Sequence, residues 1–258
     1  MSEWTVDRAA SVLLDAEAAG TDRPPITDKW PGLDLATAYA VQKETLRRRL
    51  ARGERLVGVK LGLTSRAKQQ RMNISSPLVA WLTDTMVLPA GAPVPRDRLI
   101  HPRAEPEVVF VMRSRLAGPG VTAATALAAV ESVYGGLEVI DSRYQDFRFT
   151  LPDVVADNAS SGCFVTGPVG ASPVALDLGL EACLLELNGQ VVDSATGAAV
   201  QGHPAEALAL AANDLGRRGL AIEPGWIVLT GGMTDAVAVP GGAVLAAHFT
   251  HLGSLFLP

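Results

Sequence analysis

Two glutamates, Glu105 and Glu107, stand two residues apart at the start of an apolar run in residues 102–112. In a β-strand, side chains alternate between faces, so both carboxylates project to one side and Val109 and Val111 continue that face inward. Neighbouring carboxylates repel each other, and a bound divalent cation removes this penalty. Oxygen-only ligation suits Mg²⁺ or Mn²⁺ better than zinc. The spacing therefore indicates either a metal site or two surface glutamates at a strand end.

Two further charged residues interrupt apolar runs. Glu138 lies among apolar neighbours, where a lone charge is costly without a partner, and it could supply a third carboxylate to a hard-cation site. Asp141 and Arg143 follow it and form an ordinary ion pair at the strand end in the simplest interpretation. Lys60 interrupts the apolar run 57–63, so it needs a nearby anion or a lowered pKa, unless it extends from an edge strand to solvent.

Two small polar loops could contact an anionic ligand. Residues 155–162 offer backbone N–H groups to a carboxylate, and the glycines of residues 230–234 allow close backbone approach, although either segment could be a simple tight turn. The phosphate-binding, nucleophile-elbow and zinc-protease motifs GxGxxG, GxSxG and HExxH are absent, as is the P-loop. The four histidines lack ligand spacing, and we interpret them as structural or surface residues.

These residues must be positioned by both helices and strands. Thr5 is a candidate N-cap for a first helix that ends at Gly20, and Asp34 caps a second helix. The second helix ends in a basic cluster, residues 43–52, which we interpret as a solvated helix end rather than a nucleic-acid patch because the chain is acidic and the cluster lacks aromatic residues. Further helices are expected at residues 122–134, capped by Thr122, and at residues 204–215, stopped by Gly216.

Strands outnumber helices in the remainder of the chain. The pattern predicts strands at residues 56–63, 108–112, 137–140, 163–166, 182–187, 226–229, 236–239 and 244–249, and a short polar helix at residues 65–72. Strands and helices do not alternate regularly, which argues against a doubly wound parallel sheet. The predicted class is α+β, with a mixed sheet rolled into a barrel-like core.

Composition limits the class of protein. The 258 residues suit one large domain, or one domain with a helical extension, and a net charge of −5 does not favour binding to nucleic acid or to an anionic membrane. The N-terminal residues lack the features of a signal peptide, and no apolar run is long enough for a membrane helix. Two cysteines without metal-ligand spacing are typical of a reducing compartment. We expect a cytoplasmic protein.

Several ordered motifs together resemble the branch of the fumarylacetoacetate hydrolase superfamily that contains 2-keto-4-pentenoate hydratases and 4-oxalocrotonate decarboxylases. The resemblance covers almost the whole chain. Its motifs are Val57-Gly-Val-Lys-Leu-Gly-Leu-Thr-Ser65, His101-Pro-Arg-Ala-Glu-Pro-Glu107, Leu137-Glu-Val-Ile-Asp-Ser-Arg-Tyr144, Val155-Ala-Asp-Asn-Ala-Ser160, Gly202-His-Pro204 and Leu229-Thr-Gly-Gly232.

The resemblance implies a mixed β-roll with an N-terminal helical region, divided softly into residues 1–80, with a lid at residues 64–82, and a catalytic core at residues 81–258. It implies a Mg²⁺ or Mn²⁺ site ligated by Glu105, Glu107 and Glu138, with Lys60 as the catalytic acid/base or substrate-polarising residue. The implied substrate-binding residues are Leu63, Thr64, Leu78, Asp157, Asn158, Ala159 and Ser160, and the last four would hold the carboxylate of a 2-oxo acid.

Finer features separate the two activities of this branch. Hydratases typically carry an arginine before the motif lysine and an aspartate in the lid, where this chain has Val59 and Leu78. Pro106 departs from the usual alanine between the two glutamates, and it indicates an edge or strand-start position. Residues 65–68, 140–144 and 230–234 look more like those of the decarboxylases.

The expected activity is therefore the metal-dependent decarboxylation of 2-oxohex-3-enedioate, or a close analogue, in a meta-cleavage pathway of aromatic catabolism. The alternative is a 2-oxopent-4-enoate hydratase in which Asp84 or Asp157 replaces the missing lid aspartate. A third hypothesis is a non-catalytic partner of such an enzyme. The resemblance also implies a complex with a partner hydratase or a homo-oligomer.

Overall fold

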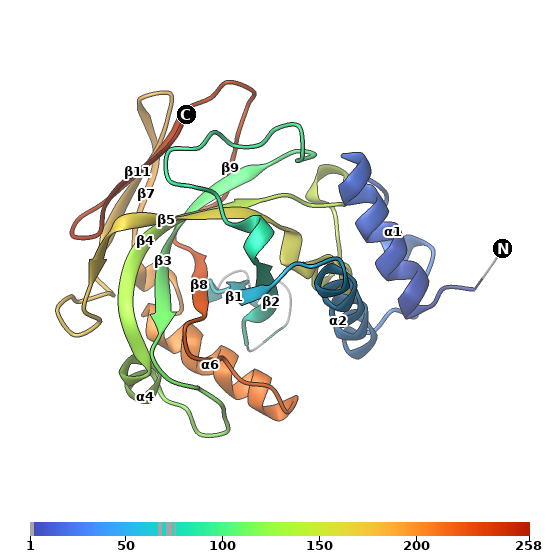
Figure 1. Ribbon diagram of the computed structural model, residues 1–258, viewed down its shortest axis with the longest axis horizontal. Helices are drawn as coiled ribbons and strands as arrows, with labels where there is room; N and C mark the ends of the chain where they lie inside the picture. The colour runs from blue at the N-terminus through green and yellow to red at the C-terminus, as the bar shows by residue number, and fades with distance from the viewer. Residues whose placement is uncertain (1–2, 67–68, 71–73, 75) are drawn as a thin grey trace.

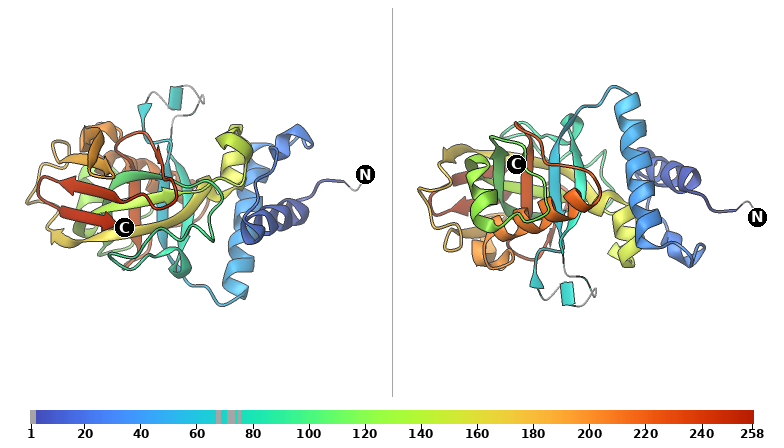
Figure 2. Two further views of the ribbon diagram at one scale, coloured as in Figure 1. Left: turned by 90° about the horizontal axis from the view of Figure 1, so that it is seen from above. Right: turned by 90° about the horizontal axis from the view of Figure 1, so that it is seen from below.

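The computed structural model describes residues 3–66, 69–70, 74 and 76–258. It consists of a curled mixed sheet, a smaller second sheet, and helices that project from one end (Figures 1 and 2). The strands are β1 (Leu56–Gly62), β2 (Leu78–Thr83), β3 (Arg103–Met112), β4 (Val130–Ile140), β5 (Ser161–Ala171), β6 (Ala182–Leu187), β7 (Gln190–Thr196), β8 (Ile227–Gly232), β9 (Val237–Ala238), β10 (Leu245–Phe249) and β11 (Gly253–Leu257). The α-helices are α1 (Val6–Ala19), α2 (Leu35–Ala51), α4 (Ala123–Ala128), α5 (Leu151–Ala156) and α6 (Pro204–Arg217).

The larger sheet has the strand order β2-β1-β8-β3-β4-β5, and β9 pairs with the start of β3. Strands β1 and β8 run parallel, and the other pairs in this sheet are antiparallel. The second sheet, β11-β10-β6-β7, is antiparallel throughout. Within the described chain the sheets do not close into a barrel. The expected α+β class with a mixed β-roll and N-terminal helices is confirmed.

The N-terminal helices begin and end where the sequence predicts. The Thr5 side chain accepts a hydrogen bond from Arg8 N, Gly20 adopts a left-handed conformation at the end of α1, and Asp34 Oδ1 accepts from Thr37 N. The basic end of α2 differs from the expectation of a solvated cluster. Arg48 binds Asp7, and Arg49 binds Glu17 and Glu54, so these guanidinium groups tie α2 to α1 and to the start of β1.

The helix expected at residues 122–134 is wrong in its second half. Thr122 caps α4 as predicted, but α4 ends at Ala128 and β4 begins at Val130. In the part expected to be helical, Val130, Val133 and Tyr134 are β-branched or aromatic, and β4 pairs along the full length of β3. Gly216 does not stop α6, which continues to Arg217. A Cβ at Gly216 would overlap the Gly118 backbone, so this glycine permits a close approach between two segments.

The strand β2 was not expected, because the resemblance assigned residues 64–82 to a lid. Residues 78–82 are instead a fully buried part of the sheet, paired antiparallel with β1. Burial on both faces removes the alternating pattern by which strands are usually recognised. The polar helix expected at residues 65–72 lies partly outside the described residues. The division into residues 1–80 and 81–258 stays a prediction, although the sheet extends across residue 80.

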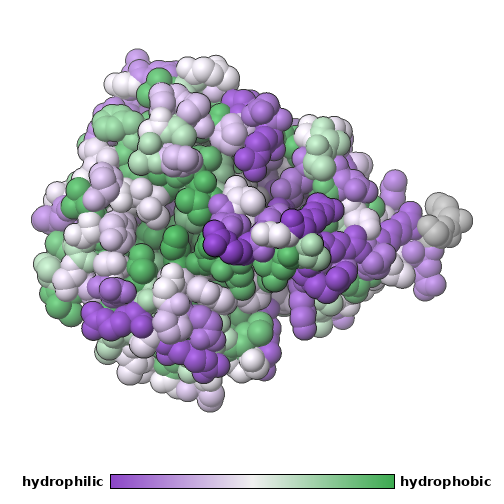
Figure 3. Space-filling model, viewed as in Figure 1, coloured by the Kyte–Doolittle hydropathy of each residue, from purple (hydrophilic) through white to green (hydrophobic). Residues whose placement is uncertain are grey.

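Three apolar clusters hold these layers together. A small cluster of Leu82, Met86, Val109, Phe164 and Leu229 fills the concave side of the larger sheet. A larger core includes residues of α6 and of both sheets, and a third joins α1, α2 and α5. On the face shown in Figure 3, apolar surface gathers over the middle of the roll, whereas the projecting helical end is largely hydrophilic. No described helix is both long and apolar enough to cross a membrane.

Candidate metal centre

Strands β3 and β4 bring three carboxylates onto one face of the sheet. Glu105 lies directly opposite Glu138 in the antiparallel pair, and Glu107 follows Glu105 on the same face of β3. One oxygen from each of the three side chains lies within 4.8 Å of the others. Like charges directly opposite each other destabilise a sheet, so the arrangement requires a compensating cation or proton. The geometry of the three carboxylates suits a metal ion, and metal ligation by them remains a prediction.

The buried carboxylates keep oxygen atoms that the protein does not satisfy. Glu107 and Glu138 are 0% and 1% exposed, and within the described chain Glu107 Oε1 and Glu138 Oε2 accept no hydrogen bond. Burial and the charges of Glu138 and Glu105 raise the pKa of Glu107 well above its usual range. Unpartnered buried carboxylate oxygens are costly, and a hard divalent cation prefers such donors. The donor set therefore fits Mg²⁺ or Mn²⁺.

Two consecutive glycines on β8 shape the rim of this cluster. Gly231 N donates a 2.7 Å hydrogen bond to Glu107 Oε2. A Cβ at Gly232 would overlap Glu105 Oε2, and a Cβ at Gly231 would overlap the Thr64 side chain. The glycines let the β8 backbone lie close to Glu105 and Glu107, and the contact of residues 230–234 with a ligand stays a prediction.

Lys60 on β1 points to the same concave face. Its Nζ lies 2.6 Å from Glu138 Oε1 and donates a 2.9 Å hydrogen bond to the carbonyl oxygen of Ala159. The side chain is 3% exposed, so the edge-strand alternative is wrong, and β1 lies between β2 and β8. A lysine held in this way presents a proton beside the carboxylate cluster. Its catalytic role is untested by this geometry and stays a prediction.

The segment after α5 has an unusual backbone. Asn158, Ala159 and Ser160 all adopt positive φ angles, between 49° and 56°, although none is glycine. Left-handed conformations of such residues are costly and persist where the surroundings enforce them, often at functional sites. Here the turn aims the Ala159 carbonyl oxygen at Lys60.

Asn158 holds this turn against β2. Its Oδ1 accepts from Trp81 N and its Nδ2 donates to Trp81 O, both at 2.9 Å. The side-chain amide thus makes the two hydrogen bonds that the backbone of a neighbouring strand would make. Sequence reasoning missed this contact, because the two residues are 77 positions apart and nothing local signals it. The side chain of Asn158 is therefore occupied by the protein.

Asp157 is held by a buried arginine. The Arg143 Nε donates to Asp157 Oδ1, its backbone N–H donates to Oδ2 at 3.1 Å, and Nη1 donates to the Ser161 carbonyl oxygen at 2.8 Å. The expected pair of Asp141 with Arg143 is wrong, since Asp141 accepts from Ile100 N and from His101 N. Burial raises the pKa of Asp157 to about 6, although Arg143 opposes this shift.

The remaining residues expected to bind substrate lie at the ends of β1 and β2. Thr64 is 3% exposed and lies against Gly231. Leu78 is 4% exposed and pairs with Gly62, and it packs in the same apolar cluster as Leu63. These side chains could form an apolar wall. Their contact with substrate remains a prediction.

Other acids and the histidines lie elsewhere. Asp84 accepts from Arg55 N and from its Nε, so neither Asp84 nor Asp157 is a free carboxylate beside the cluster. His203 Nδ1 accepts from Ala205 N at the start of α6, and His251 binds Glu181. The structural interpretation of these two histidines is confirmed.

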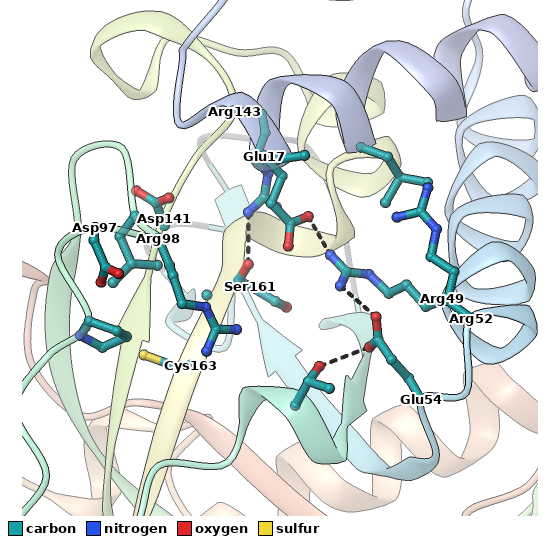
Figure 4. Close-up of a pocket in the computed structure, with 16 residues that line it drawn as sticks. Glu17, Arg49, Arg52, Glu54, Asp97, Arg98, Asp141, Arg143, Ser161 and Cys163 are labelled. Carbon is teal, nitrogen blue, oxygen red and sulfur yellow. Dashed lines mark hydrogen bonds and ion pairs between the residues drawn. The ribbon is translucent and has the colours of Figure 1, made fainter.

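A separate cavity of about 390 Å³ is lined by Arg143 and lies between the N-terminal helices and β5. Figure 4 shows Arg49 and Arg98 reaching toward it from opposite sides, and ion pairs of Arg49 with Glu17 and Glu54 along its wall. Four arginines and four acidic residues line this cavity, so it carries no excess charge.

Known proteins share both this sequence and this fold. The chain is 44% identical over 246 residues to a protein named 4-oxalocrotonate decarboxylase from Pseudomonas sp. (strain CF600), covering 95% of this chain and 93% of the relative. It is 43% identical over 222 residues to a 2-hydroxypent-2,4-dienoate hydratase from Pseudomonas putida, covering 86% of this chain and 100% of the relative.

A solved structure, 4-oxalocrotonate decarboxylase from Pseudomonas putida G7 complexed with magnesium and adipate, superposes with a TM-score of 0.95. It is 41% identical, and the match covers 97% of this chain and 95% of that one. The model of the fumarylacetoacetate (FAA) hydrolase C-terminal family matches residues 55–256. These matches agree with the curled sheet, and the chain belongs to the fumarylacetoacetate hydrolase family.

Proposed function

We propose that this protein is a divalent-metal-dependent carboxy-lyase that converts 2-oxohex-3-enedioate, or a close analogue, to 2-hydroxypenta-2,4-dienoate and CO₂. The observation that carries the proposal is the contact of buried Lys60 with one member of a three-carboxylate cluster. The names of the 44% identical relative and of the structure with magnesium and adipate support this reaction.

The residues fit a hard cation. Glu105, Glu107 and Glu138 would hold Mg²⁺ or Mn²⁺ through oxygen atoms, two of which have no partner in the described chain. When bound, the cation supplies a Lewis acid that favours electron flow toward the 2-oxo group of the substrate. The protein keeps this site on the concave face, above a floor of apolar side chains.

In the proposed step, the bond between C5 and the distal carboxylate breaks and CO₂ leaves. The electron pair moves through the C3–C4 double bond to the 2-oxo oxygen, which takes up a proton to give the dienol. Lys60 is the proposed donor, because its ammonium group is buried between Glu138 and the Ala159 carbonyl oxygen. A positioned acid of this kind typically contributes about 10²–10⁴ in rate.

We assign the other predicted substrate contacts to groups that are not already hydrogen-bonded within the protein. Asp157 binds Arg143, Asn158 binds Trp81, and the Ser160 N–H donates to the Asp157 carbonyl oxygen. We therefore assign binding of the 2-oxo acid carboxylate to the backbone N–H of Ala159, with the Ser160 side chain beside it. Thr64 would border the same site. Leu63 and Leu78 would form an apolar wall beside the distal carboxylate, whose loss is favoured where water does not solvate it.

A hydratase that adds water to 2-hydroxypenta-2,4-dienoate is the second candidate, supported by the 43% identical relative. It requires an acid or base to activate water beyond the metal cluster. Asp84 and Asp157, the two acids considered for that role, are both engaged by arginines, which favours the decarboxylase. A non-catalytic partner is a weaker third proposal, because a scaffold has no need for buried carboxylates.

We also propose a cytoplasmic location and association with a partner hydratase or with further copies of this chain. The location is supported by two free, buried cysteines, Cys163 and Cys183. The association rests on the family resemblance alone.

The test is CO₂ release from 2-oxohex-3-enedioate by the wild-type protein with Mg²⁺, beside a chelator-treated sample. Metal-dependent release is the expected result. If no CO₂ appears while 2-hydroxypenta-2,4-dienoate is consumed with addition of water, the protein is the hydratase. If neither compound reacts although the metal binds, both assignments are wrong.

A further inference from the structure

A second cavity, which the proposed reaction does not use, lies between α2, the strands β1 and β2, and the segment after α6. Its volume is about 600 Å³, within the range of small-molecule sites. Three aromatic and three leucine side chains form much of its wall. They are Tyr39, Leu46, Leu56, Trp81, Leu220 and Trp226, and we name this space the aromatic cavity.

The aromatic cavity lies on the side of the sheet opposite the metal centre. Lys60 pairs with Ala80, whereas Trp81 is the next residue along β2 and pairs with Val59, so Trp81 and Lys60 project to opposite faces. None of the three glutamates or Lys60 lines the cavity. A molecule bound there does not compete with a metal-chelated substrate.

Aromatic side chains give the cavity flat apolar surfaces. Trp81 and Trp226 meet edge to face, with ring centroids 6.4 Å apart and planes at 86°. Rings in this arrangement provide large apolar contact areas that favour another planar ring over a branched aliphatic group.

The rim of the cavity is cationic, although the whole chain carries a net charge of −5. Lys43, Arg115 and Arg218 line it together with one carboxylate, Glu223, which pairs with Arg115 at 3.3 Å. Lys43 is exposed and forms no ion pair with any described residue. The excess positive charge favours an anionic ligand.

Arg218 adds a second kind of cation, a guanidinium group, to this rim. Its guanidinium lies 4.2 Å from the centroid of the Tyr39 ring, and its Nε is 3.4 Å from Asp214 Oδ2. The side chain is 24% exposed, although Nε and Nη2 themselves are buried. The exposed part of the guanidinium can make a charge-assisted contact with a ligand carboxylate.

We propose that the aromatic cavity binds a small planar aromatic carboxylate, with the ring against the wall that includes Trp81 and Trp226 and the carboxylate at Lys43 and Arg218. The ring matches the apolar aromatic wall, and the single negative charge matches the rim. The other cavity, which Arg143 lines, has balanced charges and lacks this combination.

The test is a titration of the wild-type protein with 1-naphthoate, followed by calorimetry and by tryptophan fluorescence, with and without EDTA. We expect saturable binding that EDTA does not change, because the cavity is separate from the metal centre. The neutral isostere 1-naphthalenemethanol should bind at least about tenfold more weakly, since it lacks the charge. Trp81→Phe or Trp226→Phe should reduce the quenching, and Trp4→Phe should not.

Lys43→Ala is the charge variant, and Lys29→Ala, at another exposed lysine, is its matched control. Lys43→Ala should lower the affinity several-fold without changing the melting temperature, and Lys29→Ala should change neither. Loss of binding with EDTA, equal affinity for the alcohol, or an unchanged affinity in Lys43→Ala would overturn the proposal. So would concentration-dependent dimers that Leu220→Glu dissociates, because this face would then be an interface between copies. None of these readouts depends on decarboxylase activity.

Discussion

Lys60 Nζ lies 2.6 Å from Glu138 Oε1, although strands β8 and β3 separate β1 from β4 in the sheet. The curl of the sheet brings the two side chains together on its concave face. Since Glu138 Oε2 has no partner in the described chain, one carboxylate joins the lysine to the acidic cluster. A change in charge at Lys60 therefore alters the electrostatic environment of the acidic cluster through Glu138, and a change in the cluster alters that of Lys60.

Replacing Lys60 tests whether this residue is needed for catalysis but not for metal binding. Lys60→Ala should retain Mg²⁺, because it removes no ligand oxygen, and should lower kcat at least about 10²-fold by removing the positioned proton donor. Calorimetry with Mg²⁺ and steady-state kinetics measure the two effects. The exposed Lys29→Ala serves as control. A near-normal kcat in Lys60→Ala would refute the catalytic assignment.

Gly232 should control metal affinity without carrying any ligand atom. In Gly232→Ala the new methyl group would overlap Glu105 Oε2 and displace that carboxylate. We expect Mg²⁺ affinity to fall about tenfold or more, equivalent to about 1.4 kcal/mol. Gly241→Ala is the matched control, since its Cβ would meet nothing within 4 Å. Equal Mg²⁺ affinities of the two variants by calorimetry would remove Glu105 from the centre.

Asn158 should contribute to stability more than to substrate affinity. Asn158→Ala removes two buried hydrogen bonds to Trp81, and we expect the free energy of unfolding in urea to fall by about 2–4 kcal/mol. Asn188→Ala is the matched control: Asn188 has a similar φ of 52°, and its hydrogen bond to Val244 N is exposed. A raised KM in Asn158→Ala with unchanged stability would instead indicate a direct substrate contact.

The raised pKa of Asp157 predicts a distinctive pH dependence of stability. Burial raises this pKa to about 6, so between its usual value and about 6 the folded protein retains a proton that the unfolded chain releases. This contribution to stability is therefore largest in acid and is lost as the pH rises through about 6.

Asp157→Asn lacks this titration. The difference in unfolding free energy between wild type and variant should fall by on the order of 1 kcal/mol per pH unit from about pH 4 to pH 6, and then become constant. Urea denaturation at several pH values measures it. Parallel stability curves across this range would mean that Asp157 titrates normally.

The pairing of Glu105 with Glu107 was predictable from sequence because its geometry is local. Glu138 joins them through the register of β3 and β4, which is not local, and its expected role as a third ligand came from its lone charge in an apolar run and from the family resemblance. Alternation along one strand places Glu105 and Glu107 on one face, and their apolar surroundings mark the strand as buried. The partner of Arg143 was not predictable, because Asp141 is nearer in sequence but its oxygens accept backbone N–H groups. Tertiary pairing also decided where α4 ended and β4 began.

The left-handed turn was equally hidden. No glycine marks residues 158–160, so the sequence suggested a small polar loop or a simple tight turn without indicating its left-handed backbone. The structure shows a left-handed turn, held by the contacts of Asn158 with β2 and of Arg143 with Asp157. Such strain is imposed by distant contacts, which a local pattern does not contain.

The position of β8 has a consequence for the order of events during synthesis. This strand consists of residues 227–232, yet it lies between β1 and β3. The lysine strand therefore reaches its final neighbours only after nearly all of the chain has left the ribosome, because its parallel partner is made late. A truncated polypeptide that ends before residue 227 would contain Lys60 and all three glutamates but would lack the strand that joins them. The return of enzymatic activity during refolding would therefore indicate that β8 has taken its place between β1 and β3.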